Sequence, residues 1–73
     1  MAAVSEILAR FKLEQYASSF EDLGYDDLLY MLQMGAASEE RLVQHVGFRV
    51  GHAMKYRHYM SALRAQHGFN GIT

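Results

Sequence analysis

The chain has 73 residues, of which 51% are hydrophobic and 21% charged, and its formal net charge is −1. A chain of this length forms one small domain, and its composition is that of a globular rather than a disordered protein. It contains no cysteine, which excludes disulfides, thiolate metal sites and a cysteine nucleophile.

Two helices are predicted in the first third of the chain. Ile7, Leu8 and Phe11 fall on one face of the first helix, and we expect Ser5 to be its N-cap. Apolar residues then recur at steps of three, four and three, which predicts a second helix with one apolar face. These residues are Leu13, Tyr16, Phe20 and Leu23. Gly24 can end the second helix in a left-handed conformation.

Two further helices are predicted in the middle of the chain. Asp26 or Asp27 can cap a brief third helix that ends at Gly35. Its expected core residues are Leu28, Leu29 and Leu32. Ser38 is the expected cap of a fourth helix, with Glu39 and Glu40 in the first turn, where the helix dipole favours negative charge. Leu42 and Val46 would face the core, and Gly47 would end this helix.

The fifth predicted helix is the longest and runs from Val50 toward Gln66. Its apolar residues also follow steps of three, four and three, at Ala53, Tyr56, Met60 and Leu63. We expect the tail 68–73 to fray and a domain over residues 1–67. No stretch alternates as a strand does, so the pattern predicts an all-α fold, a compact five-helix bundle with a long C-terminal helix.

Charge is divided unevenly along the chain. Residues 13–40 contain seven acidic residues and no lysine or arginine, whereas residues 41–73 contain five basic residues and no acidic one. The small net charge therefore conceals an acidic segment followed by a basic one. This segregation is the most informative physical feature of the sequence.

Several stretches occur in an order that is shared with one family of helical domains. They are "LEQYASSF" (13–20), "YDDLLYML" (25–32), "SEERLVQHVGF" (38–48) and "VGHAMKYRHYMSAL" (50–63). Through them the chain resembles, over about residues 5–66, the sterile alpha motif domain, a five-helix interaction module. The resemblance implies binding to other such domains, or to copies of the same chain, through two different surfaces.

The resemblance also indicates which residues would form these two surfaces. One surface lies over the second to fourth helices and is often acidic, and here it would comprise Glu21, Asp22, Tyr25, Asp26, Asp27, Tyr30 and Met31. The other is the usually basic start of the last helix, and here it would comprise Arg49, Val50, Gly51, His52 and Lys55. We therefore expect head-to-tail association, with itself or with another sterile alpha motif domain. Of Asp26 and Asp27, we expect one to cap a helix.

An alternative function is RNA or DNA binding through the basic fifth helix, as in some members of the family. Phosphate contacts need clustered lysine and arginine, and aromatic rings can stack on bases. However, the pI is about 6.4, whereas basic nucleic-acid modules have values above about 9. Tyr56 also falls on the predicted core face. We therefore expect a protein partner rather than a nucleic acid.

The sequence offers no catalytic, metal or cofactor site. His45, His52, His58 and His67 are separated by seven, six and nine residues, never by the four-residue step of a helical metal site. The carboxylate pairs 26–27 and 39–40 stand at expected helix starts, where capping explains them. We expect a protein that is not an enzyme and that has no cofactor, metal or small-molecule substrate.

Membrane and secretory roles have no support in the sequence. The longest apolar run, residues 28–32, is far shorter than the roughly 20 residues that cross a bilayer. Glu6 and Arg10 fall where the apolar part of a signal peptide would lie. We therefore expect an intracellular, cytoplasmic location and no membrane partner.

His52 adds a pH-dependent expectation. It stands at the positive end of the last helix, where a partner carboxylate would approach. Because histidine gains its charge below about pH 6.5, association is predicted to tighten below that pH.

Overall fold

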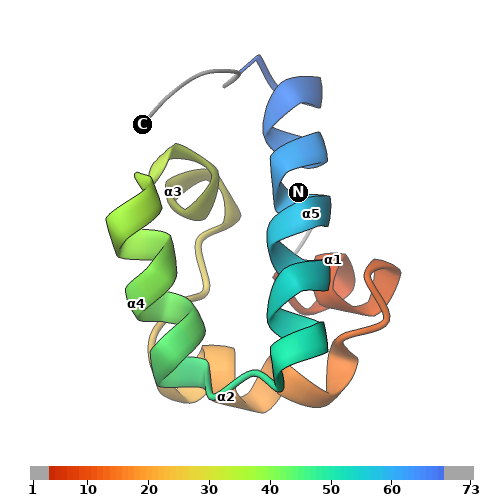
Figure 1. Ribbon diagram of the computed structural model, residues 1–73, viewed down its shortest axis with the longest axis vertical. Coiled ribbons are helices and arrows are strands. Elements are labelled where there is room, and N and C mark those ends of the chain that lie inside the picture. The colour runs from red at the N-terminus through yellow and green to blue at the C-terminus, as the bar shows by residue number, and fades with distance from the viewer. Residues whose placement is uncertain (1–3, 69–73) are drawn as a thin grey trace.

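The computed structural model describes residues 4–68 of the chain, and these residues form five α-helices and one short 3-10 turn. The elements are α1 (Val4–Arg10), η1 (Glu14–Tyr16), α2 (Ala17–Asp22), α3 (Leu28–Gln33), α4 (Ala36–Val46) and α5 (Val50–Gln66). Figure 1 shows α4 and α5 upright, with α2 at their lower ends and α3 near the top of α4. The prediction of an all-α fold with a long last helix is confirmed, while the tail from residue 69 lies outside the described residues.

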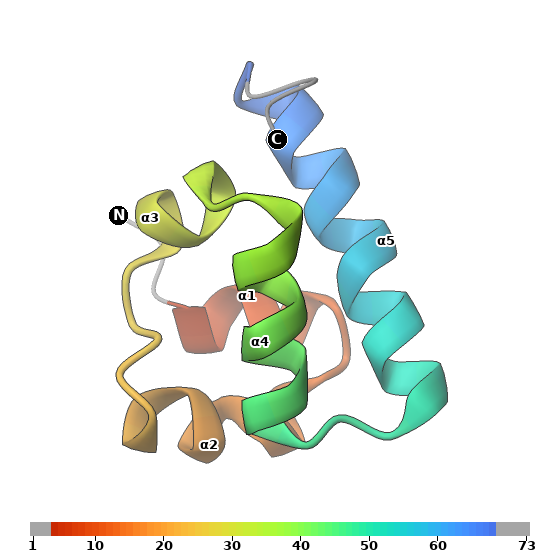
Figure 2. The ribbon, with the colours of Figure 1, turned by 60° about the vertical axis from the view of Figure 1, so that its left-hand side comes forward.

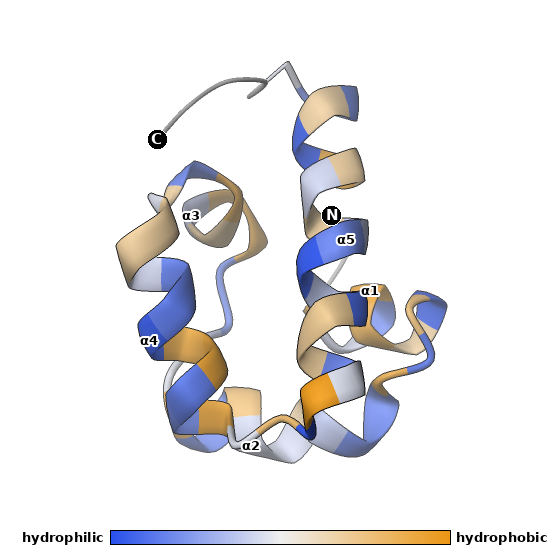
Figure 3. Ribbon diagram, in the orientation of Figure 1, coloured by the Kyte–Doolittle hydropathy of each residue, from blue (hydrophilic) through white to orange (hydrophobic). Residues whose placement is uncertain are grey.

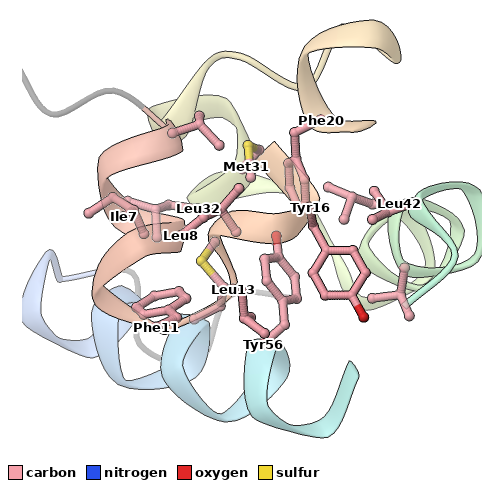
Figure 4. Packing of buried hydrophobic residues seen from close by; sticks show 14 residues of the cluster. Ile7, Leu8, Phe11, Leu13, Tyr16, Phe20, Met31, Leu32, Leu42 and Tyr56 are labelled. Carbon is pink, nitrogen blue, oxygen red and sulfur yellow. The ribbon is translucent and has the colours of Figure 1, made fainter. Parts of the chain in front are cut away.

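One hydrophobic cluster joins all five helices and η1. Figure 4 shows its side chains converging between the helices, with the Tyr56 ring from α5 among them. Most of the predicted core residues are buried: Ile7, Leu8, Phe11, Leu13, Tyr16, Phe20, Leu32, Leu42, Val46, Tyr56 and Met60. Ala53 and Leu63 are half-buried against this cluster. Leu23 and Leu29 were expected in the core but are exposed, so these two predictions were wrong.

Three predicted helix starts and ends differ from the structure. Ser5 lies inside α1, which begins at Val4. Ser38 lies inside α4, whose N-cap is Gly35, with an extended backbone and no side-chain hydrogen bond. Gly35 therefore starts α4 rather than ending α3, and only Met34 and Gly35 separate the two helices. The predicted second helix is also divided, because the chain from 14 to 22 forms η1 and then α2.

Other glycines predicted to end helices do lie at the chain reversals. Gly24, Gly47 and Gly68 all have positive φ, between 78° and 85°, which is the left-handed conformation that glycine adopts without a steric penalty. The end of α1 lacks such a glycine, and there Lys12 takes φ 60°. The amide of Leu13 donates to the carbonyl of Leu8 at 2.7 Å, which closes α1 with a Schellman-type turn.

Arg64 of α5 holds three helices together. Its Nε donates to the carbonyl oxygen of Leu32 at 3.0 Å, and one Nη donates to the carbonyl oxygen of Met31 at 3.2 Å. The same Nη forms an ion pair with Glu39 in the first turn of α4. Both side chains are mostly buried. The Arg64–Glu39 clasp therefore joins the last turn of α3, the start of α4 and α5.

Tyr56 places a hydroxyl in the core that has no hydrogen-bond partner among the described residues. Figure 4 shows this hydroxyl pointing into the cluster. Burial raises the pKa of Tyr56 far above its ordinary value, because an ionised phenolate would lose its hydration there, and the negative charge of Glu39 raises that pKa further.

Candidate interaction surfaces

The basic surface predicted from the sequence lies at the start of α5, and we call it the basic tip: Arg49, Val50, Gly51, His52 and Lys55. Arg49 is the N-cap residue and has an extended backbone. Val50 is 80% exposed, and Met54, one turn further along the same helix face, is 68% exposed. Figure 3 shows the hydrophobic colour in this first part of α5. We therefore add Met54 to the basic tip, whose apolar centre is formed by the side chains of Val50 and Met54.

The positive end of α5 adds to the charge of the basic tip. No side chain caps the first turn of this 17-residue helix, and that turn contains no acidic residue. The unpaired amide groups at such a helix start carry roughly half a positive charge. Together with Arg49 and Lys55, they make this end of the molecule attractive to carboxylates.

Tyr16 of η1 fixes the position of the basic tip. Its hydroxyl oxygen accepts a hydrogen bond from the backbone amide of Arg49 at 3.3 Å and lies 2.5 Å from Nδ1 of His52. The two rings are in edge-to-face contact, with centroids 5.4 Å apart. His52 is accordingly half-buried, and its Nδ1 is occupied by Tyr16. Nε2 of His52 makes no polar contact with another described residue.

The acidic surface lies along α2, the following connection and α3, and we call it the acidic flank. Its members by structure are Glu21, Asp22, Tyr25, Asp26, Asp27, Leu29 and Tyr30. All are exposed except Tyr25, which is half-buried and whose hydroxyl lies 3.4 Å from Nδ1 of His45. Leu29 and Tyr30 are 56% and 59% exposed and form an apolar centre beside the carboxylates.

Asp26 and Asp27 have different environments. The Asp27 carboxylate accepts a hydrogen bond from the amide of Tyr30 at 3.2 Å and is the N-cap of α3. Asp26 is exposed and makes no polar contact with another described residue. The expectation that one of the two caps a helix is confirmed, and the capping residue is Asp27.

Met31 is the one predicted surface residue that the structure moves elsewhere. It is only 2% exposed and belongs to the core. The helical period explains the error, because Leu28, Met31 and Leu32 are spaced at i, i+3 and i+4 and share one face. That face packs on the core, so Leu29 and Tyr30 point outward. Attention to this spacing would have exchanged Met31 for Leu29 in the sequence prediction.

The two surfaces lie on opposite sides of the molecule. Figure 2 shows the chain from the end of α2 to α3 along one side, while the first turn of α5 lies at the other side of the lower end. The long α4 stands between them. The charge segregation of the sequence therefore corresponds to a separation in space.

Residues 4–68 show no sign of a metal site or of a membrane-spanning helix. No group of three or more histidine, aspartate and glutamate side chains in this range could hold a metal ion. None of the described helices has the length and apolar character needed to cross a membrane. The described residues also line two shallow cavities, of about 240 and 180 Å³. The chain matches no family model, and no curated protein or solved structure is significantly similar to it.

Proposed function

We propose that this chain is a protein-interaction module of the sterile alpha motif type, and that it associates head to tail. The basic tip of one copy docks on the acidic flank of a second copy or of a related domain. The family assignment is supported by the four sequence stretches between residues 13 and 63, which occur in the order typical of that family. The observation that carries the function is the presence of two opposite surfaces, each with exposed apolar side chains beside charge of one sign.

Exposed apolar pairs supply the affinity in this proposal. Val50 and Met54 on the tip, and Leu29 and Tyr30 on the flank, are the four most exposed large hydrophobic side chains of the described residues. When the two pairs meet, apolar surface is removed from water, which stabilises the contact by about 25 cal/mol for each Å² buried. The flanking charges set the orientation and the association rate more than the affinity.

The geometry of the contact determines the kind of assembly. Because the tip and the flank are different surfaces on one chain, their contact leaves a free tip and a free flank at the two ends of each dimer. Such heterologous contacts propagate into chains unless the rotation between copies closes a ring. The proposed assembly therefore grows with concentration.

Sedimentation velocity at increasing protein concentration tests the proposal. The average sedimentation coefficient is expected to rise with concentration, and to rise less at 1 M salt, where the Debye length falls to about 3 Å. A chain that stays monomeric at the highest concentration, and binds no related domain, contradicts the proposal. A salt-sensitive gel shift of an RNA hairpin by the monomer would favour the nucleic-acid alternative.

A further inference from the structure

The larger of the two cavities, of about 240 Å³, lies between α1 and α2 on the acidic flank. Its lining residues are Val4, Ser5, Ala17, Phe20, Glu21, Tyr25 and Asp26. Val4 and Phe20 are buried and Ala17 is half-buried, so these three provide an apolar floor. The exposed residues Glu21 and Asp26 add two carboxylates.

The lining indicates which chemical group fits. A volume of about 240 Å³ is below the range of roughly 300–1,000 Å³ that is typical of small-molecule pockets. A long basic side chain matches both parts of the lining, because it packs its methylene stem on apolar atoms and keeps its charged head near carboxylates. Tyr25, whose ring is in edge contact with Phe20 at 6.2 Å, provides an aromatic surface that favours guanidinium over ammonium.

Arg49 is the basic side chain that the molecule presents most suitably. Its backbone is held by the amide hydrogen bond to Tyr16, whereas its exposed guanidinium makes no polar contact with another described residue. It is next to Val50, the most exposed large hydrophobic side chain of the described residues. Arg64, in contrast, is already engaged by Glu39.

We infer that the cavity between α1 and α2 is a socket for the Arg49 side chain of a second copy. The inference rests on the proposed function and specifies one charge-assisted contact beside its apolar centre. The alkyl stem of Arg49 packs on Phe20 and Ala17, and the guanidinium meets the carboxylates of Glu21 and Asp26. Val50 of the same copy then lies against the flank outside the socket.

Two variants isolate one contact for the test. Val50→Glu disables the tip, and its glutamate is tolerated at a helix start; Asp26→Lys disables the flank. An equimolar mixture of the two can form only one contact, between the flank of the first and the tip of the second. Isothermal titration calorimetry measures its affinity, after circular dichroism has verified that every variant is folded.

Two further changes then test the socket, one in the cavity and one in the side chain that enters it. Ser5→Leu, added to the Val50→Glu copy, fills the cavity without changing any charge, and Arg49→Ala is added to the Asp26→Lys copy. Each change is expected to weaken binding about tenfold, the effect of losing a charge-assisted contact. Together they are expected to weaken it no more than either alone, because both remove the same interaction. Ser18→Leu and Arg57→Ala, which change exposed residues outside the socket, are the matched controls and should leave the affinity unchanged.

The outcomes separate this inference from the proposed function. If the mixture associates but Ser5→Leu has no effect, or its effect multiplies with that of Arg49→Ala, the socket is wrong and head-to-tail association stands. If the mixture does not associate at all, the proposed function fails and the socket fails with it.

Discussion

Lys12 is the only residue other than glycine that has positive φ in the described part of the chain. It occupies the position after α1 where a Schellman turn usually places glycine. A left-handed conformation costs a residue with a Cβ roughly 1–2 kcal/mol. The turn persists because Leu13, which follows it, is fully buried in the core.

Relief of this conformation gives the first prediction. Lys12→Gly is expected to raise the free energy of unfolding by about 1 kcal/mol, because glycine adopts positive φ without a steric penalty. Lys12→Ala is the control, since it removes the same charge and keeps the Cβ. Urea unfolding measures both variants. The interpretation is wrong if the alanine variant gains as much stability as the glycine variant.

A second prediction compares Tyr56, whose buried hydroxyl has no partner among the described residues, with Tyr16, whose hydroxyl has two. Tyr56→Phe removes a buried hydroxyl that has no partner and is expected to leave the stability at pH 7 unchanged or to raise it by up to about 1 kcal/mol. Tyr16→Phe removes the two hydrogen bonds that hold Arg49 and His52 and is expected to cost about 1–2 kcal/mol. Thermal unfolding compares the two. Equal losses would contradict the assigned roles.

Tyr56 gives a third prediction, a loss of stability at alkaline pH. The pKa of Tyr56 is raised by burial in the folded state, so the folded chain keeps the phenol proton at a pH where the unfolded chain releases it. The titration of Tyr56 therefore leaves the free energy of unfolding unchanged below about pH 10. Above that pH it lowers the free energy of unfolding, by at most about 1.4 kcal/mol per pH unit. Tyr56→Phe should flatten this loss between pH 10 and 12. Identical slopes for the two proteins would refute the assignment.

At the scale of the elements, the Arg64–Glu39 clasp determines how α3, α4 and α5 meet. Helix α3 has only six residues, too few for a stable helix on its own. Its N-terminus is capped by Asp27, and its last carbonyls are bound by Arg64. The short helix therefore depends on contacts from residues far along the chain.

Removing one member of the clasp gives the fourth prediction. Arg64→Met leaves the mostly buried Glu39 carboxylate without its cation, which is expected to cost about 3–5 kcal/mol. That is close to the whole stability of a domain of this size, roughly 3–5 kcal/mol. The variant should therefore be largely unfolded at 25 °C by circular dichroism. The double variant Arg64→Met, Glu39→Leu should recover much of the loss, because no charge stays buried; a double variant as unstable as the single one would contradict this.

At the scale of the whole molecule, local signals predicted the helices and most of the core. Gly24, Gly47 and Gly68 marked chain reversals because positive φ is a local requirement that glycine meets. The 3.6-residue period placed Phe20 and Tyr56 in the core because each lies on a single apolar face. Ser5 and Ser38 failed as caps because capping is a preference that nearby residues, such as Gly35, can also satisfy.

The details of the surfaces depended on contacts that the sequence does not display. Glu39 and Arg64 are 25 positions apart, and Tyr16 and His52 are 36 apart, so no spacing rule links them. Leu29 and Met31 are different, because the helical spacing of Leu28, Met31 and Leu32 in the sequence already indicates that Met31 faces the core and Leu29 faces outward. The charge segregation was readable from the sequence, whereas the separation of its two parts in space required the fold.

The stoichiometry of a mixture tests head-to-tail association most directly. Val50→Glu and Asp26→Lys each keep one of the two proposed surfaces, so each variant alone should remain at the 8.3 kDa of a single chain. Light scattering of an equimolar mixture should give twice that mass and no more, because the dimer has no intact surface left at either end. The unmodified chain should grow beyond a dimer as its concentration rises. A mixture that stays monomeric while the unmodified chain assembles, or a single variant that assembles as the unmodified chain does, would contradict the account.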